Sequence, residues 1–511
     1  MTATNGTNGA NGTTGKIETR LFINNEVRSP TCTAEPQTDP NRSPQFVESS
    51  DKKTFQLLCP STREPVAAVH EASVADTNAA VAAAKAAQPA WAALSPAARA
   101  APMRKLAELL RAAHAPMARL EAVAMGRPLG AYHDHLACAS FFELNAGLGW
   151  EPQGTTSLHT PGMLNLTLRQ PFGVAAAIIP WNCPAIFFGS KAAPMVAAGN
   201  CVVVKSSEKA PLTSAFIASL IAQAGFPPGV INVLHGHGAT SGATLAAHMD
   251  VRVLSFTGSG RTGRLISEAA ARSNLKNLHL ELGGKSPALV FDDADLERAA
   301  ADTQFSMTFN TGQVCMANTR IYVQEGVAEA FVEKFKARYA AVKVGDSLAE
   351  GTQMGPLADQ MQFENVNRYI QLGKEAGGKL ILGGEEHADA GKGYFVGPHI
   401  FTELPEDSKP LKEEIFGPVV CIGTFKTEEE ALRKANDTEY GLYSAVYTKD
   451  VSRAIRIAKG LEAGTVGVNC SSPTLAADMP FGGYKSSGIG REGLKQSLNN
   501  FLEEKTVLIK L

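Results

Sequence analysis

The chain has 511 residues, 44% of them hydrophobic and 19% charged, which is enough for two or three globular domains. Its formal charge of −2 comes from 48 basic and 50 acidic residues without a block of either sign, so we expect neither a nucleic acid nor a membrane as partner. No apolar run approaches the roughly 20 residues of a transmembrane helix, and we predict a cytoplasmic protein.

The eight cysteines are scattered, without a CxxC pair or a cluster of cysteines and histidines. This spacing argues against a disulfide scaffold and against a structural metal site, so no metal is predicted. A reducing compartment fits best, because one of the thiols could stay free for chemistry there.

Residues 1–49 are predicted to be a disordered tail. The first twenty are rich in Asn, Gly and Thr and lack the apolar core of a signal peptide. Residues 27–45 hold four prolines and almost no large apolar groups. Val27-Arg28 can be encoded by a splice-donor sequence and Gln45 by a splice-acceptor sequence, so this segment is either a retained intron or a functional surface loop.

Residues 73–125 carry helical signals, because Ser73 and Ser95 can each cap an Ala-rich helix and Pro96 suits a first helical position. From Pro171 onward, short apolar runs alternate with stretches of helical length such as Pro211–Ala224. The predicted strands are Val174–Ile179, Cys201–Val204, Val230–Leu234, Val253–Phe256 and Leu278–Leu280. Apolar strands separated by helices indicate an α/β fold with a parallel sheet, which binds nucleotides at the C-terminal ends of its strands.

The second half, about 284–484, alternates strands and helices again. The final residues Glu504–Leu511 alternate apolar and polar side chains, as a strand does. A terminal strand of this kind needs another edge to pair with, and a second subunit could supply it.

The sequence Gly258-Ser-Gly-Arg-Thr-Gly263 follows a predicted strand and precedes a helix. Small residues at such a turn let a backbone approach a pyrophosphate at the helix N-terminus. A tight turn that binds no ligand would use the same glycines, so this motif alone is weak.

Three residues could carry acyl chemistry. Cys315 lies in a polar, Gly-containing stretch where a thiol could be exposed, although a cysteine is often only a small core residue. Glu281 ends a strand before two glycines; burial would raise its pKa and suit it to activating water, whereas a solvated acid would do nothing. The Asn182 amide could donate to an oxyanion together with the Cys315 backbone N–H, or merely stabilise a turn between two prolines.

Lys205 and Glu208 lie just past another strand, where ribose hydroxyls would be held. Elsewhere such a pair would be an ordinary surface ion pair worth under about 1 kcal/mol.

From about residue 50 to the C-terminus the chain resembles the aldehyde dehydrogenase superfamily. Glu281 and Cys315 are spaced as the base and nucleophile of that family are. The other stretches that carry the resemblance are Pro171-Phe-Gly-Val174, Pro180-Trp-Asn182, Lys205-Ser-Ser-Glu208, Phe256-Thr-Gly-Ser259, Leu280–Pro287, Gly312-Gln-Val-Cys315, Glu413–Pro418 and Pro480–Gly488.

The resemblance implies NAD-dependent oxidation of an aldehyde to a carboxylic acid. Cys315 would be the nucleophile that forms a thioester, Asn182 an oxyanion donor, and Glu281 the group that activates water. The residues implied in cofactor binding are Trp181, Lys205, Glu208, Gly258, Ser259, Glu414 and Phe416. NADP is less expected than NAD, because its 2′-phosphate would bring about −1.5 to −2 charges against the Glu208 carboxylate.

The family architecture implies a Rossmann-type cofactor domain at 50–148 and 172–283 and a catalytic domain at 284–484. Residues 149–171 and 485–511 would form a small β bridging element, whose terminal strand pairs across subunits in relatives. A homodimer or homotetramer is therefore expected.

The implied substrate pocket departs from that of the acetaldehyde and retinal enzymes, because small or polar residues replace aromatic ones. Cys183 follows the oxyanion asparagine where a large apolar residue is usual, and Ser190 stands where many relatives carry Trp. The predicted pocket residues are Cys183, Phe187, Ser190, Val314, Met316 and Phe481. We expect a wide mouth that admits a bulky, aromatic or long-chain aldehyde, unless neighbouring side chains fill the space.

Two other functions compete with this one. A relative that makes acyl-CoA from the same thioester would not need Glu281 to activate water, and the presence of this residue argues against it. A catalytically inactive relative kept as a binding protein would not need the full set of chemical residues.

Overall fold

The strands predicted between residues 174 and 281 form one sheet in the computed structural model, which describes residues 17–25, 45–384 and 392–511. The sheet has the order β19-β9-β8-β5-β6-β7 and is parallel except for β19, which runs antiparallel to β9. Its strands are β5 (Val174–Ile178), β6 (Cys201–Lys205), β7 (Ile231–Leu234), β8 (Val251–Thr257), β9 (Asn277–Glu281) and β19 (Gly488–Ile489).

Burial on both faces explains the composition of this sheet. All residues of β5, β6 and β7 are buried, so these strands are continuous apolar runs without alternation. The chain passes outward through β5, β6 and β7 and then returns to the other side of β5 for β8 and β9. The strand order therefore reverses between β5 and β8, which is where doubly wound folds bind dinucleotides.

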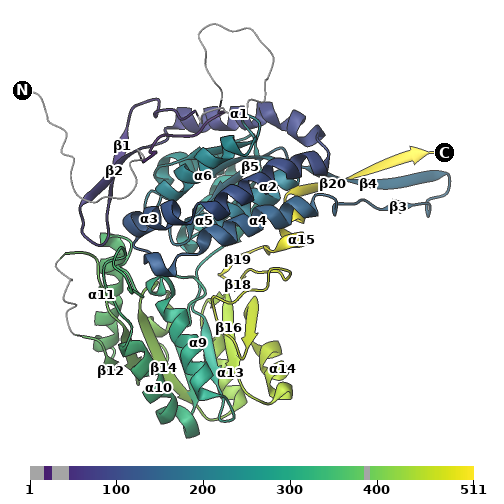
Figure 1. Cartoon of the computed structure of the whole chain (residues 1–511). Coiled ribbons are helices and arrows are strands. Elements are labelled where there is room, and N and C mark those ends of the chain that lie inside the picture. Colours follow the sequence, from purple (N-terminus) through teal and green to yellow (C-terminus); the bar gives the residue numbers. More distant parts are fainter. Residues whose placement is uncertain (1–16, 26–44, 385–391) are drawn as a thin grey trace, which may run out of the picture.

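Helices cover both faces of this sheet (Figure 1). Ser73 caps the first of them with a reciprocal capping box, and Ser95 caps the second ahead of Pro96, as predicted. The helices are α1 (Val74–Ala93), α2 (Pro96–Ala112), α3 (His114–Met125), α4 (Asp134–Leu148), α5 (Pro184–Ala197), α6 (Leu212–Gln223), α7 (Ala243–Ala247) and α8 (Gly260–Arg272), with short turns η1 (Leu129–Ala131) and η2 (Gly238–Gly242).

The second half builds a seven-stranded sheet with the order β12-β13-β14-β11-β10-β16-β17, parallel except for β12. Its strands are β10 (Pro287–Val290), β11 (Arg320–Gln324), β12 (Lys379–Leu382), β13 (His399–Thr402), β14 (Val419–Phe425), β16 (Tyr443–Tyr447) and β17 (Thr465–Val468). Its helices are α9 (Leu296–Thr308), α10 (Ala328–Ala340), α11 (Gln360–Glu375), α12 (Lys409–Lys412), α13 (Glu428–Asn436) and α14 (Val451–Gly460), with turns η3 (Phe309–Gly312) and η4 (Glu325–Val327).

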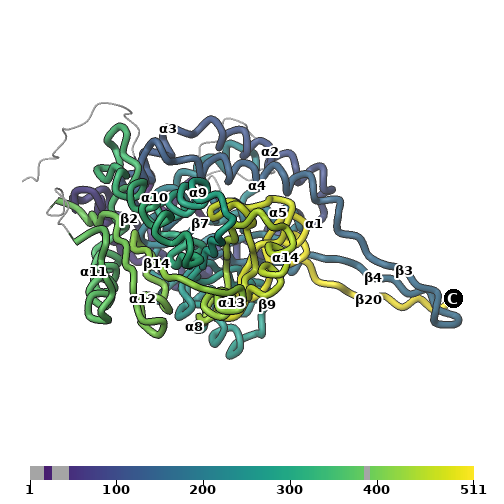
Figure 2. Tube along the Cα trace, turned by 90° about the horizontal axis from the view of Figure 1, so that it is seen from below, coloured from purple at the N-terminus to yellow at the C-terminus, as the bar shows by residue number. Residues whose placement is uncertain are grey.

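A three-stranded antiparallel arm projects from the body of the molecule (Figures 1 and 2). It consists of β3 (Thr156–Ser157), β4 (Met163–Pro171) and β20 (Leu502–Lys510), and the short helix α15 (Leu494–Asn499) leads into it. The C-terminal strand β20 thus pairs along its whole length with β4 of its own chain. One of its two edges is therefore paired without a second subunit. Its outer edge has no strand beside it within the described residues.

Residues 484–489, here called the strap, pair with strands from both halves of the chain. β18 (Tyr484–Lys485) pairs with β15 (Tyr440–Gly441) of the second half, and β19 then pairs with β9 of the first. Within the expected bridging element at 485–511, Gly488–Ile489 therefore belong to the six-stranded sheet and β20 belongs to the arm.

Part of the predicted disordered tail is folded. Leu21 and Phe22 are buried, and their backbones pair with Val47 and Val233. Hydrophobic burial of these two side chains outweighs the polar composition around them. The proposed insertion at 27–45 lies almost wholly outside the described residues, but its flanks meet, since Gln45 N–H donates to Asn25 Oδ1 at 3.1 Å.

The N-terminal hairpin β1 (Thr54–Leu58) and β2 (Pro65–His70) packs beside α3 and α6. Across the described ranges, no helix is long and apolar enough to cross a membrane.

Candidate active site

Four predicted site residues lie at the C-terminal ends of neighbouring parallel strands. Asn182 follows β5, Lys205 ends β6, Ser259 follows β8 and Glu281 ends β9. The strand ends of a parallel sheet share one edge, so the sheet itself brings these side chains to one side of the fold.

Cys315 approaches this edge from the second half of the molecule. It follows η3, in which Asn310 and Thr311 adopt left-handed backbone conformations with φ of 50° and 59°. The side chain is only 8% exposed, which corrects the prediction of an exposed thiol. The polar stretch around it faces other chain segments instead of solvent.

Glu281 is buried next to Cys315, with 3% of its surface exposed. Burial raises the pKa of Glu281 to about 7, although the adjacent thiol opposes this shift. The pKa of Cys315 is raised well above its ordinary value by burial and by the Glu281 carboxylate. Near neutral pH the pair therefore consists of a protonated thiol beside a carboxyl group that can accept its proton.

Two glycines allow this close packing. A Cβ atom on Gly284 would lie 2.1 Å from the carbonyl oxygen of Cys315, and one on Gly283 would lie 2.5 Å from a carboxylate oxygen of Glu414. The Gly-Gly pair after Glu281 is thus required for the second half to meet the end of β9.

The Asn182 amide is oriented by the turn that precedes the thiol. Its Nδ2 donates to the Gln313 carbonyl at 3.1 Å, while Asn310 Nδ2 donates to the Asn182 carbonyl at 2.9 Å. One N–H of Asn182 remains for another acceptor. The Cys315 backbone N–H has no acceptor within the described part of the chain. These two donors fit an oxyanion beside the sulfur.

A buried ion pair that sequence reasoning missed lies near Glu281. Lys191 Nζ contacts Glu492 at 2.6 Å and donates to Ser255 Oγ at 2.9 Å; its side chain is fully buried, and that of Glu492 is 19% exposed. Lys191 lowers the pKa of Glu281 and Glu492 raises it. The only signal in the sequence was a single lysine in the otherwise uncharged segment that forms α5.

The predicted cofactor residues of the first sheet lie at the ends of β6 and β8, which flank β5. Lys205 is buried, and its Nζ is 3.9 Å from a carboxylate oxygen of the partly exposed Glu208. Burial lowers the pKa of Lys205, and Glu208 opposes this effect. Ser259 caps α8, and Gly258 packs against the Phe256 ring, where a Cβ atom would come within 2.5 Å. A helix N-terminus fits a pyrophosphate, and a polar pair such as Lys205 and Glu208 fits the hydroxyls of a ribose.

The second half contributes two further predicted cofactor residues, and one of them contacts Trp181 of the first half. Glu414 is buried and accepts the Gly284 N–H at 3.0 Å; burial raises its pKa to about 7. Phe416 has φ of 60°, and its ring meets Trp181 edge to face at 5.3 Å. Phe416 of the second half therefore meets the first half at Trp181.

The predicted substrate residues are divided between the two halves. Cys183 and Val314 are buried at 5% and 7% exposure, and Phe187 and Met316 are partly buried. Ser190 follows Phe187 by one helical turn on α5, and Phe481 pairs through its backbone with Glu492. The thiol of Cys183 lies 3.8 Å from the Arg127 guanidinium, a neighbour that the sequence did not indicate.

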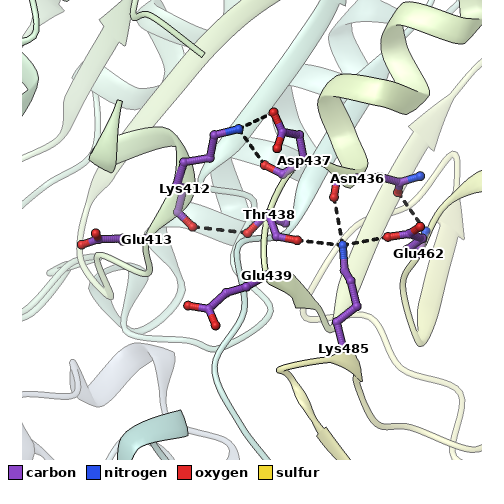
Figure 3. Close-up of a pocket in the computed structure, with 8 residues that line it drawn as sticks. All are labelled: Lys412, Glu413, Asn436, Asp437, Thr438, Glu439, Glu462 and Lys485. Atoms are coloured by element: carbon purple, nitrogen blue, oxygen red, sulfur yellow. Dashed lines mark hydrogen bonds and ion pairs between the residues drawn. The ribbon is translucent and has the colours of Figure 1, made fainter. Parts of the chain in front are cut away.

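A surface pocket of about 490 Å³ lies beside the strap (Figure 3). Lys485 Nζ donates to the carbonyls of Asn436 and Thr438 and pairs with Glu462 at 2.9 Å, while Lys412 pairs with Asp437. Its ammonium groups are thus already paired, and none of the predicted site residues lines it. The contacts of Lys485 attach the strap to the second half of the chain.

No group of three or more His, Cys, Asp and Glu side chains in the described ranges could hold a metal ion. The seven cysteines that the structure describes are all free thiols.

Comparison with known proteins gives one family throughout. The model of the aldehyde dehydrogenase family matches residues 46–507. An aldehyde dehydrogenase of Emericella nidulans is 43% identical over 496 residues, which cover 96% of this chain and 95% of that protein. Aldehyde dehydrogenase 1A1 of Gallus gallus is 40% identical over 499 residues, covering 96% and 94%.

Among solved structures, the P. syringae indole-3-acetaldehyde dehydrogenase AldA, in complex with NAD+ and IAA, superposes with a TM-score of 0.91. It is 36% identical, with 98% of each chain covered. The chain therefore belongs to the aldehyde dehydrogenase family.

Proposed function

We propose that this chain oxidises an aldehyde to a carboxylic acid with NAD, through a thioester on Cys315. The observation that carries the proposal is the buried Cys315 thiol beside the buried Glu281 carboxyl, with one free N–H on the Asn182 amide and another on the Cys315 backbone. A nucleophile, a base and an oxyanion site together define acyl chemistry at a carbonyl carbon.

In the first step Glu281 removes the thiol proton and the sulfur forms a bond to the aldehyde carbon. The carbonyl electron pair moves to oxygen, and the Asn182 amide and the Cys315 N–H hold the resulting oxyanion. NAD+ supplies the acceptor for the hydride that leaves this carbon. What remains of the substrate is then an acyl group, joined to Cys315 as a thioester.

In the second step Glu281 removes a proton from water, whose oxygen attacks the thioester carbon. The carbon–sulfur bond breaks, the acid leaves, and the sulfur recovers a proton from Glu281. The proton taken in the first step must leave before Glu281 can act again.

NAD is favoured over NADP because Glu208 lies beside Lys205 at the end of β6. A ribose with free hydroxyls can donate to this carboxylate, whereas a 2′-phosphate would be repelled by it.

The substrate we propose is a bulky, aromatic or long-chain aldehyde, held among Cys183, Phe187, Ser190, Val314, Met316 and Phe481. The small side chains at Cys183 and Ser190 support this class. A higher kcat/KM for propanal than for every aromatic or long-chain aldehyde would contradict it.

We also propose a homo-oligomer, either a dimer or a tetramer. The arm supports this, because β20 has an unpaired outer edge and the arm exposes large apolar side chains, among them Leu158 and Leu508 at 70% and 65%. Light scattering of the intact chain and of a chain that ends at residue 501 would test the contribution of the arm.

The function is tested by following NADH formation over a panel of aliphatic, aromatic and polyene aldehydes, in parallel with NADP. Turnover that is lost in Cys315→Ala, while NAD binding is retained, is the expected result. No NADH from any aldehyde in the wild-type chain would contradict the proposal. Adding CoA separates the rival: formation of acyl-CoA in place of free acid would favour a CoA-acylating enzyme.

A further inference from the structure

Arg127 is a buried cation close to the proposed oxyanion site, and the proposed mechanism leaves it without a role. It lies between α3 and η1, and only 1% of its surface is exposed. Its Nη2 pairs with Asp134 Oδ1 at 2.9 Å, and both side chains are almost wholly buried. A buried ion pair of this kind contributes little to net stability on average, so its presence calls for another reason.

The guanidinium makes two further contacts. Its Nη1 lies 3.8 Å from the sulfur of Cys183, and its central carbon lies 4.3 Å from the centroid of the Phe309 ring. A guanidinium over an aromatic face is a favourable contact, and more so when it is removed from water. Arg127 thus holds one residue from the β5–α5 turn and one from the turn before Cys315.

These two residues are the direct chain neighbours of a hydrogen-bonded pair. Cys183 follows Asn182, Phe309 precedes Asn310, and Asn310 Nδ2 donates to the Asn182 carbonyl at 2.9 Å. The same two turns meet again where Asn182 Nδ2 donates to the Gln313 carbonyl. Arg127 therefore braces the junction that sets the distance between the Asn182 amide and the Cys315 N–H.

We propose that Arg127 is a positioning residue for the oxyanion site, holding the Cys183 and Phe309 turns so that both donors address one oxygen atom. The inference rests on the proposed function, because it concerns the same site. It also assigns a role to the small residue at position 183: its thiol makes room for the guanidinium where a large apolar side chain would displace it.

The test uses the full-length chain and the variants Arg127→Lys and Phe309→Leu. Lysine keeps the charge that Asp134 needs, but it loses the planar group that spans Cys183 and Phe309. Leucine removes the aromatic face and leaves the ion pair intact, so it carries the test if the lysine variant does not fold. Arg99→Lys is the matched control, because Arg99 is also a buried arginine but donates to the Ala92, Leu94 and Ala197 carbonyls.

Three quantities separate positioning from general damage. They are the single-turnover rate constant for NADH formation, the Kd for NAD, and the rate constant for alkylation of Cys315 by iodoacetamide. We expect Arg127→Lys to lower the single-turnover rate constant about 10- to 100-fold, the size of effect that a small misplacement of reacting groups produces. The Kd for NAD and the alkylation rate constant should stay within about twofold of wild type. Phe309→Leu should lower the single-turnover rate constant in the same way, and Arg99→Lys should leave it unchanged.

The double variant adds a further check. If both side chains act through one brace, the combined loss should be clearly smaller than the product of the two single losses. An unchanged turnover rate in Arg127→Lys or in a folded Phe309→Leu variant, or a parallel loss of NAD binding and alkylation, would overturn the inference. A wild-type chain that forms no NADH from any aldehyde would instead overturn the proposed function, and this inference with it.

Discussion

Replacing Glu281 by glutamine should make the protein more stable than wild type at alkaline pH and not at acidic pH. The carboxyl is 3% exposed, and burial raises its pKa from 4.5 to about 7. The folded protein therefore favours the protonated form. The contribution of the Glu281 carboxyl to the free energy of unfolding is complete below pH 4.5 and is lost as the pH rises through 7. Glutamine stays neutral at every pH, so its own burial adds nothing that depends on pH.

The magnitude follows from the two pKa values. At 1.36 kcal/mol per tenfold change, the difference amounts to about 3 kcal/mol above pH 7. An unfolding entropy of about 2.1 cal/mol/K per residue gives about 1.1 kcal/mol/K for a chain of this length. Because part of this difference is already present at pH 5, the Tm of Glu281→Gln, relative to wild type, should rise by about 2 °C between pH 5 and pH 9.

Thermal unfolding followed by dye binding across this range, at one protein concentration, measures the difference. Glu333→Gln, which changes an exposed carboxylate on α10, is the control and should show no such trend. A Tm difference that stays the same from pH 5 to pH 9 would refute the reasoning, because it would mean that Glu281 is not desolvated in the folded protein.

Three other changes test the site. Asn182→Ala should lower kcat about 100- to 1,000-fold with an unchanged Kd for NAD, since one oxyanion donor is lost; a kcat within fivefold of wild type would contradict that role. Gly284→Ala places a Cβ atom against the Cys315 carbonyl, and we expect it to lower both Tm and kcat, whereas Gly326→Ala, which has open space, should change neither. Glu208→Gln should raise the ratio of NADP to NAD turnover about tenfold at low salt by removing the repulsion of the 2′-phosphate, and an unchanged ratio would place that phosphate elsewhere.

The first sheet could be predicted from the sequence because its strands are buried on both faces and read as continuous apolar runs. The predicted strands differ from β5 to β9 by only a few residues at their ends, and the serine caps of α1 and α2 are confirmed. The family resemblance is confirmed by the family match and by relatives along the whole chain. Local composition and the order of the motifs were sufficient to predict these features.

The environment of the thiol could not be predicted, because it depends on contacts between distant segments. The stretch around Cys315 is polar, and polarity alone suggested exposure. It is buried because the Gly283-Gly284 turn brings β9 against it. The Lys191–Glu492 pair joins residues 301 positions apart, and Arg127 meets Cys183 across 56 positions. No local sequence pattern predicts contacts between residues so far apart in the chain.

The strap has a consequence for how the chain is made. Glu281 lies on β9, whose outer neighbour β19 comes from residues 488–489, about 200 residues later in the chain. At about 5 to 20 residues per second, a ribosome needs about 10 to 40 s to synthesise that interval. During this time the nascent chain holds Glu281 on a strand that lacks its outer neighbour. The buried environment that sets the pKa of Glu281 therefore belongs to the finished chain, and it is completed only at the end of synthesis.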